Sequence, residues 1–197
     1  MPKLKNKERE NIQNSFLLFL ASQAQAITLF TNNYSLKNIM AKVIIIMGSK
    51  ADLEWSEKIA SALDKFGISS ILRIASAHKV PLKCLEIIKK YEVENVVFIT
   101  VAGRSNALSG FCDAQTHCPV IACPPYADKF AGTDVYSSLR MPSGVSPMVV
   151  LEPDNAALAA AKILAVSDEN IREKIKNFQK KNRDKLIDDD NSLTTRV

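Results

Sequence analysis

An unbroken apolar run from Val43 to Met47 constrains the fold of this chain more than any other feature. The run is rich in β-branched residues and has no polar alternation, which is typical of a strand buried on both faces of a parallel sheet. It ends at Gly48-Ser49. Residues 52–66 then place apolar side chains near helical spacing, and Gly67 follows as a stop signal. This stretch therefore predicts a strand followed by a helix.

The same alternation recurs along the chain. Further strands are predicted at 70–74, 95–101, 120–123 and 147–151, and helices at 81–91, 106–116 and 153–164. Strands joined by helices in this way imply right-handed crossovers and a parallel sheet covered on both faces. We therefore expect an α/β protein, a three-layer α/β/α sandwich with a flavodoxin-like, parallel five-stranded sheet.

Length and composition fit one domain with appendages. With 197 residues and 47% hydrophobic content, the chain can bury a sizeable core, which we place at residues 41–165. Residues 166–197 are expected to add a C-terminal helix, capped by Ser167-Asp168-Glu169 and ending at about Lys185, and then a frayed tail. Its thin apolar stripe, with Phe178 as the largest member, has to lie on the parent domain or on a neighbouring protomer.

Residues 1–40 are expected to form a poorly ordered extension. The basic stretch 3–9, the apolar stretch 16–21 and the small residues 24–26 resemble a weak secretory or organellar signal. However, the apolar stretch is too short for a membrane span, and Met40 could serve as an internal start. We expect a cytoplasmic protein, with an export or organellar signal in this extension as the alternative.

The positive charge of the chain does not predict nucleic-acid binding. The net charge is +5, but residues 1–40 carry five Lys/Arg against two Asp/Glu, whereas residues 41–165 carry thirteen against twelve. Nucleic-acid binding requires a clustered basic face. We expect neither a nucleic-acid nor a membrane partner.

The cysteines predict free thiols of a reducing compartment. They form no C-x-x-C pair, and their spacing with His117 matches no familiar structural zinc pattern. We therefore expect no metal site. The four are Cys84, Cys112, Cys118 and Cys123.

Three polar loops should follow the first three predicted strands, at 48–52, 76–79 and 102–106. In an open parallel sheet, ligands bind beyond the carboxyl ends of the strands, so these loops should share one site. Their glycines would permit close backbone approach and positive φ, and their serines would lie near helix N-termini, which attract phosphate. The residues concerned are Gly48, Ser49, Ser76, Gly103 and Ser105.

Charged residues in the same loops strengthen this prediction. Lys79 and Arg104 add positive charge, and Asp52 could accept hydrogen bonds from two ribose hydroxyls. Taken singly, Ser and Asp before a helix are ordinary caps. Taken together, the loops predict an anionic sugar ligand. A nucleoside triphosphate or a dinucleotide is disfavoured because the chain has neither a Walker sequence nor a G-x-G-x-x-G fingerprint.

The two histidines receive opposite interpretations. His78 follows the second predicted strand, and an imidazole at this edge of the sheet could act as a catalytic acid/base. The alternative is a solvated loop residue without a function. His117 precedes Cys118-Pro119 at the other edge of the sheet, where a helix cap or surface role is favoured.

Five ordered motifs within residues 42–165 give this chain a specific resemblance. It is similar to the phosphoribosylaminoimidazole carboxylase (AIR carboxylase) family of purine biosynthesis. The motifs are Met47-Gly48-Ser49-x-x-Asp52, Ser76-Ala77-His78-Lys79-x-Pro81, Val101-Ala102-Gly103-Arg104-Ser105-Asn106, Cys123-Pro124-Pro125 and Ser137-Ser138-Leu139-Arg140-x-Pro142-Ser143-Gly144.

The resemblance implies a catalytic domain at 41–165 that carboxylates 5-aminoimidazole ribonucleotide (AIR) at C4 with CO2. His78 would be the acid/base. Small-molecule substrates, no cofactor and a homo-oligomer, an octamer in this family, are also implied. The implied ribonucleotide-binding residues are Ser49, Asp52, Ser76, Lys79, Gly103, Arg104 and Ser105.

Two features indicate which class of the family the chain resembles. Lysine after the histidine and the Ala-Gly-Arg-Ser-Asn loop resemble the class that uses CO2 directly. The other class, a mutase that moves a carboxylate from N5 to C4, typically has arginine after the histidine and a Gly-Gly-Ala-Ala-His loop, and it remains the alternative. Ala51 and Val80 depart from the residues common in relatives, and Ala51 could remove one phosphate hydrogen bond.

Two further interpretations remain open. The same sheet could belong to a non-catalytic flavodoxin-like nucleotide-binding module, because fold alone decides no function. Residues 124–144 are long for a connection between two strands. This segment could close over the site or cross to a neighbouring subunit.

Overall fold

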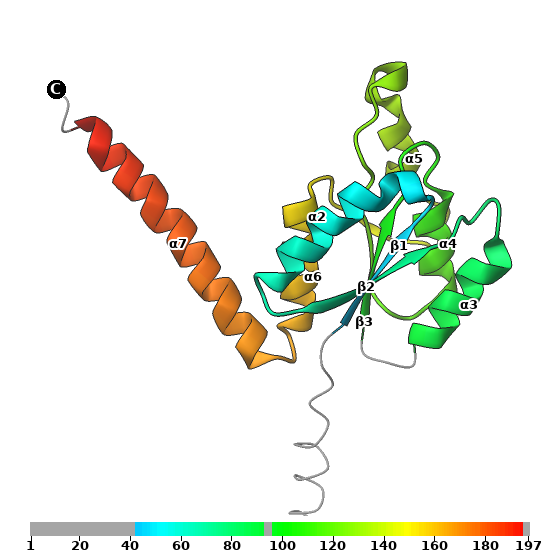
Figure 1. The fold of residues 1–197 in the computed structure, drawn as a ribbon, viewed down its shortest axis with the longest axis horizontal. Coiled ribbons are helices and arrows are strands. Elements are labelled where there is room, and N and C mark those ends of the chain that lie inside the picture. Colours follow the sequence, from blue (N-terminus) through cyan, green and yellow to red (C-terminus); the bar gives the residue numbers. More distant parts are fainter. Residues whose placement is uncertain (1–41, 93–95, 195–197) are drawn as a thin grey trace, which may run out of the picture. The chain divides into compact units, whose positions relative to one another are not determined.

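The structure is a computed structural model that describes residues 42–92 and 96–194 (Figure 1). The expected extension at residues 1–40, with its possible targeting signal, lies outside the described residues and stays a prediction.

A five-stranded parallel sheet forms the centre of the fold, as the apolar runs predicted. The strand order is β2-β1-β3-β4-β5, and every neighbouring pair is parallel. Strand β1 is buried from Val43 to Met47, and β3 is buried along its whole length. The fifth strand is shorter than predicted because only two of its residues pair with β4. The strands are β1 Lys42–Met47, β2 Ser69–Ile74, β3 Val96–Val101, β4 Val120–Ala122 and β5 Met148–Val149.

Helices cover both faces of the sheet, which confirms the three-layer architecture (Figure 1). On one face, α2 and α6 pack over a core that contains Ile45 and Ile99. On the other face, α3 and α4 pack over Ile44 and Phe98. Because neighbouring residues of a strand point to opposite faces, a continuous apolar run supplies both cores. The helices are α2 Leu53–Asp64, α3 Pro81–Tyr91, α4 Ala107–Gln115 and α6 Pro153–Leu164.

The C-terminal helix α7 runs from Glu169 to Thr194 and is longer than predicted. The predicted end at Lys185 is wrong, and the expected frayed tail is helical through Thr194. Ion pairs between successive turns, such as Lys180 with Asp184 at 2.6 Å, support such a polar helix. At its start, Asp168 accepts hydrogen bonds from two backbone N–H groups, so the predicted cap is present.

The apolar stripe of α7 packs on the parent domain. Ile171 and Ile175 are buried in the core that also contains the alanines of α6. The ring of Phe178 meets Phe66 edge to face, with 5.4 Å between the ring centroids. These contacts attach the first half of α7 to the domain.

All four cysteines are buried and free, as predicted. Burial raises the pKa of the Cys123 thiol to about 12. The neighbouring Trp55 side chain lowers this pKa, but its effect is smaller than that of burial. The Cys84 thiol and burial both raise the pKa of Cys112. These two thiols therefore stay protonated at neutral pH and are poor nucleophiles.

Native protein should consequently react slowly with alkylating reagents at Cys123. At pH 8, a pKa of about 12 against about 8.5 in an unfolded chain should slow iodoacetamide labelling roughly a thousandfold. Peptide mass spectrometry before and after unfolding in urea measures the two rates. Equal rates would contradict the burial of this thiol.

The segment between β4 and β5 projects beyond the sheet (Figure 1). It contains the 3-10 segment η2, Lys129–Val135, and the short helix α5, Tyr136–Leu139. At its tip, Phe130, Ala131 and Gly132 all have positive φ, with values of 54°, 51° and 75°. This conformation is unusual for the first two residues, and the Phe130 side chain is exposed.

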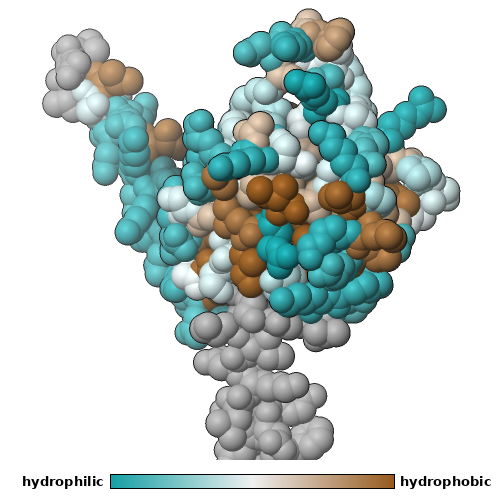
Figure 2. All heavy atoms as spheres, turned by 45° about the vertical axis from the view of Figure 1, so that its right-hand side comes forward, coloured by the Kyte–Doolittle hydropathy of each residue, from teal (hydrophilic) through white to brown (hydrophobic). Residues whose placement is uncertain are grey.

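The surface is mixed in character. Figure 2 shows hydrophobic patches surrounded by hydrophilic residues on one face of the molecule. The exposed apolar side chains include Ile74, Val80 and Leu82, which flank the second loop in the sequence. Within residues 42–92 and 96–194, no helix is both long and apolar enough to cross a membrane.

Candidate active site

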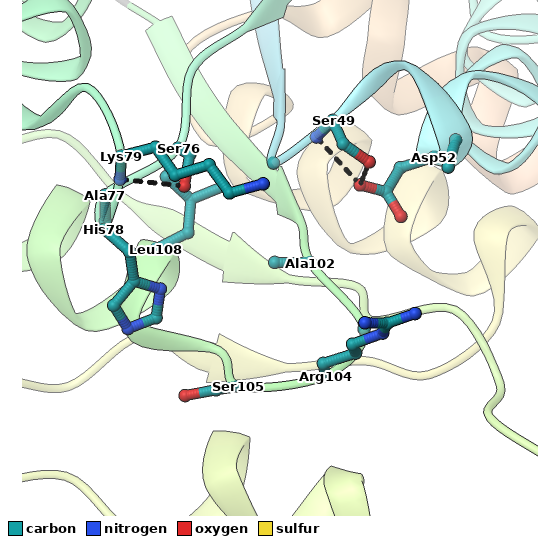
Figure 3. Close-up of a pocket in the computed structure, with 13 residues that line it drawn as sticks. Ser49, Asp52, Ser76, Ala77, His78, Lys79, Ala102, Arg104, Ser105 and Leu108 are labelled. Carbon is teal, nitrogen blue, oxygen red and sulfur yellow. Dashed lines mark hydrogen bonds between the residues drawn. The ribbon is translucent and has the colours of Figure 1, made fainter. Parts of the chain in front are cut away.

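One cavity brings the three polar loops together. The ends of β2, β1 and β3 are level, because Met47 pairs with both Ile74 and Val101. The loops that follow these adjacent strands therefore meet at one edge of the sheet, around a cavity of about 440 Å³. This volume is within the usual range for small-molecule sites. The residues singled out in the sequence all line it: Ser49, Asp52, Ser76, His78, Lys79, Gly103, Arg104 and Ser105 (Figure 3).

The first loop is closed by its own side chains. Asp52 Oδ2 accepts hydrogen bonds from the Ser49 backbone N–H at 3.0 Å and from Ser49 Oγ at 3.1 Å. The carboxylate thus fixes the turn between β1 and the 3-10 segment η1, Lys50–Asp52. The capping interpretation holds for this pair. Both residues nevertheless line the cavity, and the other oxygen of Asp52 points away from Ser49 (Figure 3).

The second loop is a tight turn that carries His78. Ser76 Oγ accepts from the Lys79 backbone N–H at 3.3 Å, and the Ser76 carbonyl accepts from the Val80 N–H at 2.9 Å. Ser76 is therefore not the cap of α3, whose N-cap is Val80 with Pro81 in the first turn. In Figure 3 the Lys79 side chain extends toward the first loop, while the His78 ring points toward the side of Ser105.

The expectation that Gly48 and Gly103 adopt positive φ is wrong. Neither Gly48 nor Gly103 has a positive φ. A Cβ at Gly48 would meet its nearest neighbour at 3.6 Å, which is ordinary contact, whereas a Cβ at Gly103 would lie 3.1 Å from Pro125 Cγ. Close approach is therefore required at Gly103, where the chain after β4 presses against the loop.

One residue of the site, Leu108, lies outside the three loops. Leu108 is buried in the first turn of α4 and lines the cavity with the small side chains of Ala51, Ala77 and Ala102. Leu108 is two residues after the third motif, so its helical position is the only signal for it in the sequence. His117 is exposed between α4 and β4 and is not among the described residues that line the cavity.

The projecting segment contributes a second, smaller hollow beside the first. About 170 Å³ in volume, it lies among Pro124, Pro125, Tyr126 and Leu151, and it shares Gly103 with the main cavity. Tyr126 stacks edge to face on Trp55, with 5.4 Å between ring centroids, and its hydroxyl donates to Glu152. This hydrogen bond raises the pKa of the Tyr126 phenol. The start of the segment is thus attached to α2 and α6.

The arrangement suits a ligand with an anionic end and hydroxyl groups. Lys79 and Arg104 supply positive charge, and the serine hydroxyls of the three loops can donate hydrogen bonds. His78 is the single histidine among the described residues that line the cavity. No group of three or more His, Cys, Asp or Glu side chains able to hold a metal ion occurs in residues 42–92 and 96–194.

Comparison with known proteins yields consistent similarities. The sequence model of the AIR carboxylase family matches residues 42–185. A phosphoribosylaminoimidazole carboxylase of Archaeoglobus fulgidus is 64% identical over 152 residues, which cover 77% of this chain and 84% of that protein. The human bifunctional phosphoribosylaminoimidazole carboxylase/phosphoribosylaminoimidazole succinocarboxamide synthetase is 42% identical over 137 residues, 68% of this chain and 32% of that protein.

Solved structures agree with the sequence similarity. A crystal structure of Treponema denticola PurE superimposes with a TM-score of 0.76 at 51% identity and covers 78% of this chain and 98% of that one.

Proposed function

Because the chain belongs to the AIR carboxylase family, whose members are enzymes of purine biosynthesis, we propose that it joins CO2 directly to C4 of AIR. The product would be 4-carboxy-5-aminoimidazole ribonucleotide, and the reaction would be reversible. The observation that carries this proposal is the single cavity lined by all eight residues that the motifs select. Membership of an enzyme family counts against the non-catalytic module.

The ribonucleotide would be held mainly by the loops. Ser49, Ser76 and Ser105 would donate to phosphate or ribose oxygens, and Asp52 would accept from ribose hydroxyls. Lys79 and Arg104 would offset the phosphate charge. Such contacts position the ring against CO2, and a displacement of about 1 Å can cost roughly a hundredfold in rate.

His78 would move the proton. The aminoimidazole ring is an electron-rich enamine, so its C4 attacks CO2, a carbon–carbon bond forms, and the CO2 oxygens take the negative charge. The intermediate still carries a proton on C4. His78 accepts this proton, the electron pair of the C–H bond returns to the ring, and the imidazole later releases the proton. In the decarboxylating direction the same imidazole returns a proton to C4.

Two residues favour CO2 over the N5-carboxylated substrate. Lys79 directly follows His78 and lines the same cavity, and Arg104 belongs to the Ala-Gly-Arg-Ser-Asn loop. These are the two positions at which the chain resembles the class that uses CO2. The mutase class is the second candidate, since it shares the fold and most of the motifs.

An assay with two substrates decides between the candidates. Purified protein is given AIR with bicarbonate and CO2, or the N5-carboxylated ribonucleotide alone, and product formation is followed for both. We expect turnover of AIR that rises with dissolved CO2 and little turnover of the carboxylated ribonucleotide. Preference for the carboxylated ribonucleotide would establish the mutase. A protein inactive with both substrates would refute the proposed function.

Assembly and location complete the proposal. We expect a cytoplasmic homo-oligomer without nucleic-acid or membrane partners, on the basis of resemblance and of the near-neutral charge of residues 41–165. Light scattering on the full chain and on a chain that begins at Met40 measures the number of subunits. The same comparison tests whether residues 1–40 contribute to assembly.

A further inference from the structure

A buried hydrogen-bonded junction lies behind the third loop and joins it to the projecting segment. Asn106 directly follows Ser105 and is 2% exposed, as is Ser138 on α5. Asn106 Nδ2 donates to Ser138 Oγ at 2.9 Å, and the Asn106 backbone N–H donates to Ser137 Oγ at 3.0 Å. Among the described residues, the lining of the cavity includes Ser105 but not Asn106, Ser137 or Ser138.

The direction of each bond in the junction is fixed by its partners. Asn106 Oδ1 accepts from the Ser109 backbone N–H at 3.1 Å, and because that group can only donate, Nδ2 must face Ser138. Ser137 Oγ donates its one proton to the Asp134 carbonyl at 2.7 Å, so it accepts from Asn106. Both polar atoms of the Asn106 side chain thus have a hydrogen-bond partner, which is the usual condition for burying an amide.

Capping alone does not require this arrangement. The bond from Ser109 to Oδ1 already caps α4, and it would form equally with Asp or Ser at position 106. The bonds to Ser137 and Ser138 instead span 31 and 32 residues of sequence. They connect the third loop to the projecting segment, and such long-range bonds are not needed to cap a helix.

The same segment also holds the other end of the loop. Pro125 packs so closely on Gly103 that a Cβ there would approach its ring to 3.1 Å. Arg104 and Ser105, between these two points, are exposed and line the cavity. Their positions are therefore determined at both ends by residues of the segment 124–144.

We propose that Asn106 is a positioning residue that, through Ser137 and Ser138, holds Arg104 and Ser105 in place for the ribonucleotide. This inference rests on the proposed function. On this inference, the segment between β4 and β5 sets the geometry of the third loop of its own subunit. Loss of the junction should weaken substrate binding while leaving proton transfer by His78 in place.

The variant Ser138→Ala tests this directly. It removes the acceptor of Asn106 Nδ2 but keeps the cap of α4 and every residue that lines the cavity. We expect the KM for AIR to rise about tenfold with kcat within about twofold, because a contact made equally to substrate and transition state affects KM alone. Amide hydrogen exchange at residues 102–106 should become faster.

The control is Ser167→Ala, which removes an exposed hydroxyl that donates to the Leu164 carbonyl at 3.4 Å, between α6 and α7 and away from the cavity. It should change neither kinetic constant nor exchange at 102–106. An unchanged KM for Ser138→Ala, or equal losses in both variants, would overturn the positioning role. If Ser138→Ala does not fold, Asn106→Ser retains a capping oxygen but is too short to reach Ser138, and the same readouts apply.

The exchange measurement separates this inference from the proposed function. Should the unaltered protein turn over neither ribonucleotide, the proposed function fails, yet exchange at 102–106 still reports on the junction. Unchanged exchange in Ser138→Ala would then refute the positioning role, and faster exchange would support it.

Discussion

Replacing His78 by Asn is expected to lower carboxylation of AIR at least about a hundredfold, the usual scale for a positioned proton-transfer group. Asparagine has a similar size and can still form hydrogen bonds, but it cannot take the proton from C4. His78 is exposed on a turn that Ser76 closes, so the substitution removes no buried contact. Initial rates at saturating AIR, together with a melting curve, separate lost chemistry from lost folding.

The control for this variant is His117→Asn. His117 is also exposed, but it lies between α4 and β4 and is not among the described residues that line the cavity. Its replacement should leave the rate within about twofold, as expected of a surface substitution away from the site. Normal activity in His78→Asn would remove His78 from the mechanism, and an equal loss in both variants would point to a general effect.

Truncation of Leu63 to Ala should lower the free energy of unfolding by about 2–5 kcal/mol. Leu63 lies on α2 with 0% exposure, in the core that also contains Ile45, Ala157 and Ala160. The alanines of α6 bring the two helices close together, so they have no side chains long enough to refill the space. The loss combines the transfer free energy of the removed methyl groups with that of the remaining cavity.

Leu186→Ala is the matched control, with the same chemical change on a helix. Leu186 is on α7 with 70% exposure, so its truncation should change stability by less than about 0.5 kcal/mol. Urea denaturation of both variants at the same protein concentration measures the difference. Similar losses at the two positions would mean that Leu186 is buried against another surface in solution, for example a neighbouring subunit.

The sheet and the site at the carboxyl ends of its strands were predictable, because the sequence patterns that indicate them are local. The run from Val43 to Met47 contains no polar residue, and only burial on both faces suits such a strand. Once three such strands are adjacent, the loops after them have to meet. The motif residues in those loops were therefore expected around one site, and all of them except Asn106 line one cavity.

Other features required the three-dimensional structure. The sequence suggested positive φ at Gly48 and Gly103, but the strain occurs instead at Phe130 and Ala131. It suggested that α7 would end near Lys185, whereas the helix continues to Thr194. The glycine outcome has no signal in residue type alone, because backbone conformation in a loop also depends on what packs against it.

By itself, the sequence determined the order of strands and helices along the chain, the polar carboxyl ends of the first three strands and the loop residues that line the cavity. Only the tertiary structure decided how the third loop is held. Asn106 and Ser138 are far apart in the chain, and their hydrogen bond forms because the fold returns α5 to the start of α4. Periodicity reports which face of an element is buried, but it does not report which distant residue will satisfy a buried amide.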